Sequence, residues 1–190
     1  MNIQQKKIEN IILYFANRAN NNTIDRLKLM KLIWLSDRLH LNKYGRLIIK
    51  DRYKALPNGP IASTALDMSN YSLPEVYDVD GYNIKAKTNC QEDYFSKSDL
   101  KVMNYIWEKY GDMDTFELRD FSHLFPEWLR YEKELKAKTF PNSYDIVIQD
   151  FFETPTSDNI DFSDFYNAED SELSEQDFNI HRSIQSLLKA

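Results

Sequence analysis

The sequence predicts a mainly α-helical domain of the α+β class, built around one buried central helix with a small antiparallel β element. Three observations predict this fold. Residues 24–44 are predicted to form a helix with apolar side chains on nearly every side, which is typical of a helix buried at the centre of a domain. Helical spacing of apolar residues recurs at 3–19 and 100–110. Alternating residues on both sides of Asp80-Gly81 indicate a β-hairpin.

Length and composition predict one domain, with room for an appendage. The chain has 190 residues, of which 42% are hydrophobic and 14% are aromatic, enough for a sizeable core. The single cysteine, Cys90, excludes an intrachain disulfide framework and fits a reducing compartment. No apolar run approaches the roughly 18–20 residues that a membrane span needs, and the N-terminus lacks the features of a secretory signal. We therefore expect a cytoplasmic location and no membrane partner.

The charge is distributed unevenly along the chain. Residues 1–54 carry twelve Lys and Arg against four acidic residues, whereas residues 141–190 carry two against eleven. The formal net charge of the whole chain is −6. Either the acidic C-terminal part folds onto the basic N-terminal part, or the basic face meets an acidic partner. The sequence leaves both interpretations open.

Helix signals organise the first 45 residues. Residues 3–19 are predicted to form an amphipathic helix, which the three asparagines at 20–22 end. Thr23 or Asp25 is predicted to cap the central helix, and Gly45 suits the left-handed position after its last turn. Polar residues in the last two turns indicate that this end of the helix reaches solvent: Asp37, Arg38, His40 and Lys43.

Short extended segments follow the central helix. Residues 47–49 and 53–56 are predicted to form a hairpin or strand pair. A turn is expected at 57–59, and Pro60 suits the first position of a helix that runs to about Met68.

The Asp-Gly hairpin is predicted to pair residues 77–79 with 82–86. Tyr94-Phe95 is a candidate for a further edge strand. A small antiparallel sheet is expected in this part of the chain.

Helical patterns return in the second half of the chain. A helix is predicted from a cap at 96–98 to Tyr110, and Asp114 is predicted to cap the next one. Pro126 breaks that helix and can start another, whereas residues 146–152 form a short apolar element of ambiguous type.

The change in composition after residue 152 predicts the domain organisation. Residues 1–152 are predicted to form the domain. Residues 153–190 are predicted to be an acidic C-terminal extension that ends in a helix at 174–189, with Phe178 among its docking residues. The acidic part also carries interspersed aromatic residues, namely Phe162, Phe165 and Tyr166.

No catalytic, cofactor-binding or metal-binding motif is present in the sequence. It contains no phosphate-binding glycine loop, no G-x-S-x-G elbow and no H-E-x-x-H motif. The three histidines, His40, His123 and His181, lie far apart in the sequence. We therefore expect a protein that is not an enzyme and holds no cofactor or metal. An acid–base site assembled in space from distant residues stays open as an alternative.

Binding to a protein is favoured over binding to nucleic acid. Basic residues crowd the stretch 26–54, but the acidic chain as a whole is unsuited to strong phosphate binding. The central helix is also too apolar for a recognition helix. Aromatic and cationic residues after the central helix suit a protein interface: Tyr44, Arg46, Arg52 and Tyr53.

An ordered set of short motifs links these segments. The set comprises Lys31-Leu32-Ile33-Trp34, Asp37, His40, Tyr44-Gly45-Arg46, Tyr53, Gly59-Pro60-Ile61, Ser122-His123 and Pro126-x-Trp128. In this order the motifs resemble the SocA-like, or Panacea, domain of bacterial and phage antitoxins, over about residues 3–130. Trp34 stands where that family usually has Tyr, and Ile61 where it usually has Val.

The resemblance implies a mostly helical domain that acts as the antitoxin of a toxin–antitoxin pair and neutralises its cognate toxin by direct binding. The expected partner is a toxin encoded by the adjacent gene; the oligomeric state is left open. The alternative is an interaction protein of a phage or mobile element that blocks or adapts another host protein, for example by delivery to a protease.

Twelve residues are candidates for toxin binding or for holding the motifs together: Lys31, Trp34, Asp37, His40, Tyr44, Arg46, Arg52, Tyr53, Gly59, Pro60, His123 and Trp128. Asp37, His40 and His123 have two interpretations. They tie helix ends to loops through buried hydrogen bonds, or they form an acid–base site.

Overall fold

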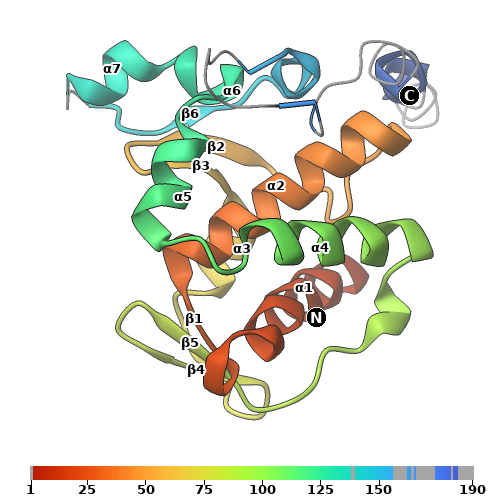
Figure 1. Ribbon diagram of the computed structural model, residues 1–190, viewed down its shortest axis with the longest axis vertical. Coiled ribbons are helices and arrows are strands. Elements are labelled where there is room, and N and C mark those ends of the chain that lie inside the picture. Colours follow the sequence, from red (N-terminus) through yellow and green to blue (C-terminus); the bar gives the residue numbers. More distant parts are fainter. Residues whose placement is uncertain are drawn as a thin grey trace.

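A computed structural model of the chain shows a mainly helical protein with two small antiparallel sheets, as predicted (Figure 1). The structure describes residues 2–137, 140–155, 162–163, 165, 174–180 and 182–183. None of the described helices has the length and apolar character needed to cross a membrane.

Helix α2 (Arg26–Tyr44) is the central element. It packs against α1 (Ile3–Arg18), α4 (Lys97–Tyr110) and α5 (Thr115–Ser122), which surround it in Figure 1. Every residue of α2 from 29 to 42 is buried. A helix that is covered on all sides in this way is the core of the domain, as its all-round apolar surface predicts.

The prediction that the last two turns of α2 reach solvent is wrong. Asp37, Arg38 and His40 are fully buried, and only Lys43 and Tyr44 are exposed. The chain folds back over this end of the helix after Tyr44. The short 3₁₀ helix η3 (Ile148–Phe152) also packs against α2.

The ends of α2 carry the predicted caps. The carboxylate of Asp25 accepts the backbone N–H of Lys28 at 3.0 Å. Gly45 is left-handed, with φ of 64°, and its N–H returns to the carbonyl of Leu41. Residues Thr23–Asp25 form strand β1 and are not the first turn of the helix, and the asparagines at 20–22 form a single 3₁₀ turn, η1.

The first sheet contains β1, β4 (Tyr77–Asp80) and β5 (Asn83–Ala86), in the order β1-β5-β4. This confirms the Asp-Gly hairpin. Tyr94, by contrast, belongs to the 3₁₀ helix η2 (Glu92–Tyr94) and adds no strand.

The second sheet corrects the predicted strand pair after α2. Strand β2 (Tyr53–Leu56) pairs with β3 (Gly59–Ala62) and, on its other side, with β6 (Tyr144–Asp145). Residues 47–49 form no strand. Pro60 lies in β3 and does not start a helix; the next helix, α3, is Ser63–Met68. Because β3 is an edge strand, the missing N–H of Pro60 is tolerated there.

The remaining helices start at the predicted caps. Ser96 and Asp114 each form a capping box at the start of α4 and α5. Pro126 opens α6 (Pro126–Leu129), and α7 (Glu132–Lys136) follows.

Aromatic side chains that follow residue 152 contact the preceding part of the chain. Phe162 and Phe165 are buried, and their rings lie 5.4 Å and 5.5 Å from the ring of Phe125. Residues 174–180 are helical, and Phe178 lies 6.1 Å from Phe152. Tyr166 and the predicted helix beyond residue 183 lie outside the described residues.

Candidate functional site

Most of the twelve candidate residues are buried. Lys31, Trp34, Asp37 and His40 have 0% exposure. Four others are also buried: Tyr53, Gly59, Pro60 and Trp128. Exposed or partly exposed surface remains on Tyr44, Arg46, Arg52 and His123. Most of the motif therefore faces the inside of the protein, where it forms three clusters.

In the first cluster, Asp37 fixes the loop that follows α2. Its carboxylate accepts the backbone N–H groups of Ile48 and Ile49, the latter at 3.3 Å, and the hydroxyl of Tyr53. Burial raises the pKa of Asp37 to about 6, although these three hydrogen bonds favour the ionised form. The backbone N–H groups of residues 48 and 49 thus donate to a side chain and not to a strand partner.

His40 fixes the start of the same loop. Its Nδ1 lies 2.8 Å from the carbonyl of Arg46, and its Nε2 lies 3.1 Å from both Ser98 Oγ and Asp99 Oδ1. Since a carbonyl only accepts, Nδ1 carries a proton.

Asp99 is the shared anchor of this cluster, and the sequence interpretation missed it. Its carboxylate binds Lys7 at 2.8 Å and Arg46 at 2.6 Å. Burial raises the pKa of Asp99, but the hydrogen bonds from His40 and Lys7 outweigh it and hold that pKa well below the usual range. The predicted cap at 96–98 lies next to Asp99, and in the structure Ser96 and Asp99 form a capping box.

Two further contacts hold the end of the loop. Gln4 Nε2 donates to the carbonyl of Lys50 at 2.9 Å. The carboxylate of Asp51 accepts the N–H groups of Thr64 and Ala65 at 3.1 and 2.9 Å, which caps α3. Residues 45–52, called the exit loop below, are therefore tied to α1, α2, α3 and α4.

The second cluster joins Lys31 to the turn between β2 and β3. Lys31 Nζ donates to the carbonyl of Pro60 at 2.8 Å. Gly59 has φ of 96°, and a Cβ there would lie 2.3 Å from Ser122 Oγ and 2.6 Å from Lys31 Nζ, so only glycine fits. Burial lowers the pKa of Lys31 well below its ordinary value.

His123 and Trp128 extend this second cluster. The two rings stack with centroids 3.8 Å apart, and Trp128 Nε1 donates to the carbonyl of Leu56 at 2.9 Å. Burial, with Lys31 nearby, lowers the pKa of His123 to about 4, so the ring is neutral at neutral pH.

The third cluster is centred on Glu127, which the sequence interpretation also missed. Glu127 Oε1 accepts from Trp34 Nε1 at 3.1 Å and from Arg38 Nε at 3.0 Å, and all three side chains are buried. Arg38 also donates to the carbonyl of Glu153 at 2.7 Å and lies 4.7 Å from the ring of Phe125. An arginine inside an apolar helix needs an acidic partner, but nothing in the local sequence identifies Glu127 as that partner.

The structure does not bring the three proposed acid–base residues together at one place. Asp37 and His40 face the exit loop, whereas His123 lies on Trp128 near Lys31. Within the described part of the chain, no group of three or more His, Cys, Asp or Glu is placed to hold a metal ion.

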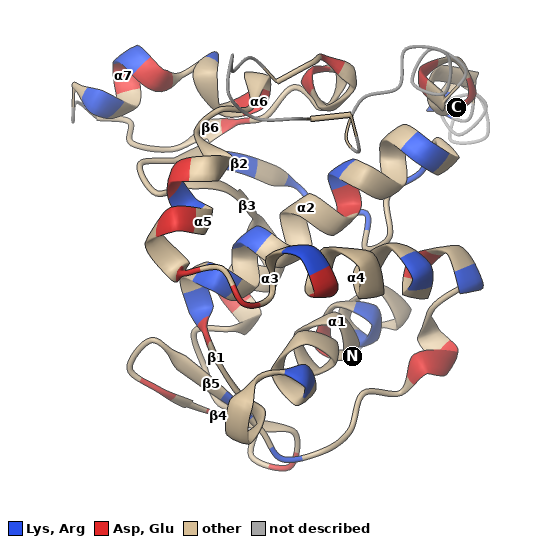
Figure 2. Cartoon of the chain, in the orientation of Figure 1, with Lys and Arg blue, Asp and Glu red and all other residues tan. Residues whose placement is uncertain are grey.

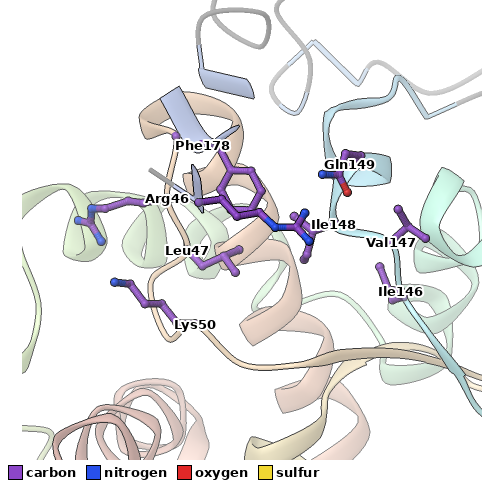
Figure 3. Close-up of a pocket in the computed structure, with 10 residues that line it drawn as sticks. Arg46, Leu47, Lys50, Ile146, Val147, Ile148, Gln149 and Phe178 are labelled. Carbon is purple, nitrogen blue, oxygen red and sulfur yellow. The ribbon is translucent and has the colours of Figure 1, made fainter. Parts of the chain in front are cut away.

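An open surface cavity of about 610 Å³ lies on the outer side of the exit loop (Figure 3). We call it the exit groove. Its lining comes from the exit loop, from residues 146–149 and from two residues near the C-terminus: Gly45, Arg46, Leu47, Lys50, Ile146, Val147, Ile148, Gln149, Phe178 and Arg182. Figure 3 shows Leu47, Ile148 and Phe178 among the apolar side chains of this lining.

Comparison with known proteins gives one family match. Residues 29–129, more than half of the chain, match the family model described as "Antitoxin SocA-like, Panacea domain". No curated protein and no solved structure matches the chain. The matched range contains the exit loop and the three buried clusters. The contacts from Gln4, Lys7 and Glu153 come from outside it. The other two walls of the exit groove lie outside it.

Proposed function

Because the chain belongs to the SocA-like antitoxin family with a Panacea domain, we propose that it neutralises a cognate toxin by direct protein–protein binding, without catalysis. The family supports an antitoxin role in general. Binding of one toxin as the mechanism is inferred from the site.

The exit groove is the observation that carries this proposal. Its described lining consists of apolar, amide and cationic side chains and contains no His, Cys, Ser or carboxylate. Such a lining suits recognition, because it offers apolar area and hydrogen bonds but no acid–base pair or nucleophile. Asp37 and His40 support the groove from behind by fixing the exit loop.

Co-expression with the product of the adjacent gene tests the proposal. We expect that product to stop growth when it is expressed alone, and growth to resume when this chain is produced with it. A matched plasmid with an early stop codon in this chain is the control. A neighbour that is harmless alone, or equally toxic in both strains, would contradict the proposal. Recovery of a host enzyme in place of the neighbour would favour the mobile-element alternative.

Stoichiometry separates binding from catalysis. With purified components, a binding antitoxin reduces toxin activity in proportion to its concentration, and neutralisation is complete only near molar equivalence. An enzyme that modifies the toxin would act at far lower amounts and at a rate that depends on time. Complete neutralisation at one hundredth of the toxin concentration would overturn the non-enzymatic part of the proposal.

A further inference from the structure

We propose that the exit groove binds a segment of the toxin in which apolar side chains are accompanied by carboxylates. This inference rests on the proposed function and adds the chemistry of the partner segment. It is carried by the composition of the groove, by its unbalanced charge and by the rigidity of its wall.

The centre of the groove is apolar and open to solvent. Leu47 and Ile146 form part of its floor and are nearly buried, whereas Val147 is 41% exposed. Phe178 adds an aromatic ring to this lining. An apolar hollow of this size accepts a few side chains of a partner, and removal of that surface from water favours binding.

The charged groups of the groove all have the same sign. Arg46, Lys50 and Arg182 belong to its lining, and no Asp or Glu does among the described residues. Lys and Arg also mark the nearby C-terminal end of α2 in Figure 2. The whole chain has a formal net charge of −6, so the sign of the charge in the groove is opposite to that of the chain. A positively charged groove is complementary to carboxylates.

Two of these three cations have no side-chain partner within the described part of the chain. The guanidinium of Arg46 is held by Asp99 at 2.6 Å and is turned away from the groove in Figure 3. The exposed side chains of Lys50 and Arg182, in contrast, make no hydrogen bond or ion pair within the described parts of the chain. Asp177, five residues before Arg182 in the sequence, lies close to Gly45 and does not line the groove. Among the described residues, Lys50 and Arg182 thus offer exposed positive charge that no described carboxylate pairs with.

The wall that carries Lys50 is held in place before any partner binds. Asp37 and His40 fix the backbone of the exit loop, and Gln4 holds the carbonyl of Lys50 itself. A preformed wall loses little conformational entropy on binding. Lys50 also adopts φ of 49°, a left-handed conformation that residues other than glycine rarely adopt, so the fold holds its backbone in a disfavoured conformation.

The position of the walls relative to the family match explains how one scaffold can serve a particular partner. The exit loop lies within residues 29–129, which match the family, whereas residues 146–149 and 174–183 lie outside that range. The groove thus combines a wall from the matched range with two walls from outside it.

Charge reversal in the groove tests the inference. The affinity of the purified full chain for the product of the adjacent gene is measured by titration calorimetry. Lys50→Glu and Arg182→Glu are each expected to weaken binding about tenfold, with a larger loss at low salt than at high salt. Lys50→Arg is expected to retain wild-type affinity. Lys85→Glu is the matched control, because Lys85 is exposed on β5 in the other sheet.

The outcomes separate this inference from the proposed function. If the wild-type chain does not bind the neighbour, the proposed function fails. If it binds, but both reversals leave the affinity unchanged in chains that fold normally by circular dichroism, the groove does not recognise carboxylates. A dimer that dissociates on Lys50→Glu while toxin affinity is unchanged would assign the groove to a second copy of this chain. A fatty acid bound there in native mass spectrometry would likewise overturn the inference.

Discussion

Glu127→Ala is expected to lower the free energy of unfolding by about 3–5 kcal/mol, because it leaves the buried guanidinium of Arg38 without its carboxylate. Both side chains have 0% exposure, so water cannot replace the lost partner. Trp34 Nε1 loses its acceptor as well. Urea unfolding at neutral pH measures the change.

Matched variants identify the cause of that loss. Glu127→Gln keeps the shape and one acceptor oxygen, so it is expected to cost less than Glu127→Ala. The double variant Arg38→Met with Glu127→Leu removes both charges and is expected to be more stable than Glu127→Ala alone. If Glu127→Ala costs less than about 1 kcal/mol, Arg38 does not depend on this ion pair.

Asp37→Ala is expected to lower the free energy of unfolding by about 3 kcal/mol, because two backbone N–H groups and the hydroxyl of Tyr53 lose their acceptor in a buried place. The variant should also weaken toxin binding, because the exit loop is no longer fixed. Urea unfolding and calorimetric titration check the two effects. Unchanged toxin affinity in a folded Asp37→Ala variant would show that the loop is not part of the binding surface.

The titration of Asp37 gives this prediction a pH dependence. Burial raises the pKa of Asp37 from 3.8 to about 6. Between these two pH values the folded state retains a proton that the unfolded state releases. The stability that the protonated group contributes is therefore fully present below about pH 4 and is lost as the pH rises through about 6. Asp37→Asn cannot titrate. The free energy of unfolding of this variant, minus that of the wild type, should be lower at acidic pH than at neutral pH. The same difference at both pH values would contradict the raised pKa.

Local signals in the sequence predicted the elements that depend on local structure. The all-round apolar surface of 24–44 identified the central helix, and Asp25, Gly45, Ser96 and Asp114 all act at helix ends as predicted. The Asp-Gly hairpin formed for the same reason, since its turn determines its pairing.

The errors arose where distant partners decide the structure. Charged residues near the end of α2 were predicted to reach solvent, but Arg38 finds its partner 89 residues later in Glu127. The apolar run 47–49 has the composition of a strand, yet its backbone amides bind the carboxylate of Asp37. No single-sequence pattern reveals such pairs, because their spacing follows no secondary-structure period.

The twelve candidate residues stay a prediction as a binding site. Most of them are buried, in clusters around the central helix, and Tyr44, Arg46, Arg52 and His123 keep some exposed surface. The exit groove could not be predicted, because its lining residues are far apart in the sequence. The exit loop ends almost 100 residues before Ile146, and the two segments meet only in the fold.

Hydrogen exchange of the chain with and without its toxin tests most directly whether the exit groove is the binding surface. If it is, the toxin should slow exchange at 45–50 and 146–149, and leave the sheet of β1, β5 and β4 unchanged. Protection confined to that sheet, with the exit groove unaffected in a fully formed complex, would contradict the assignment.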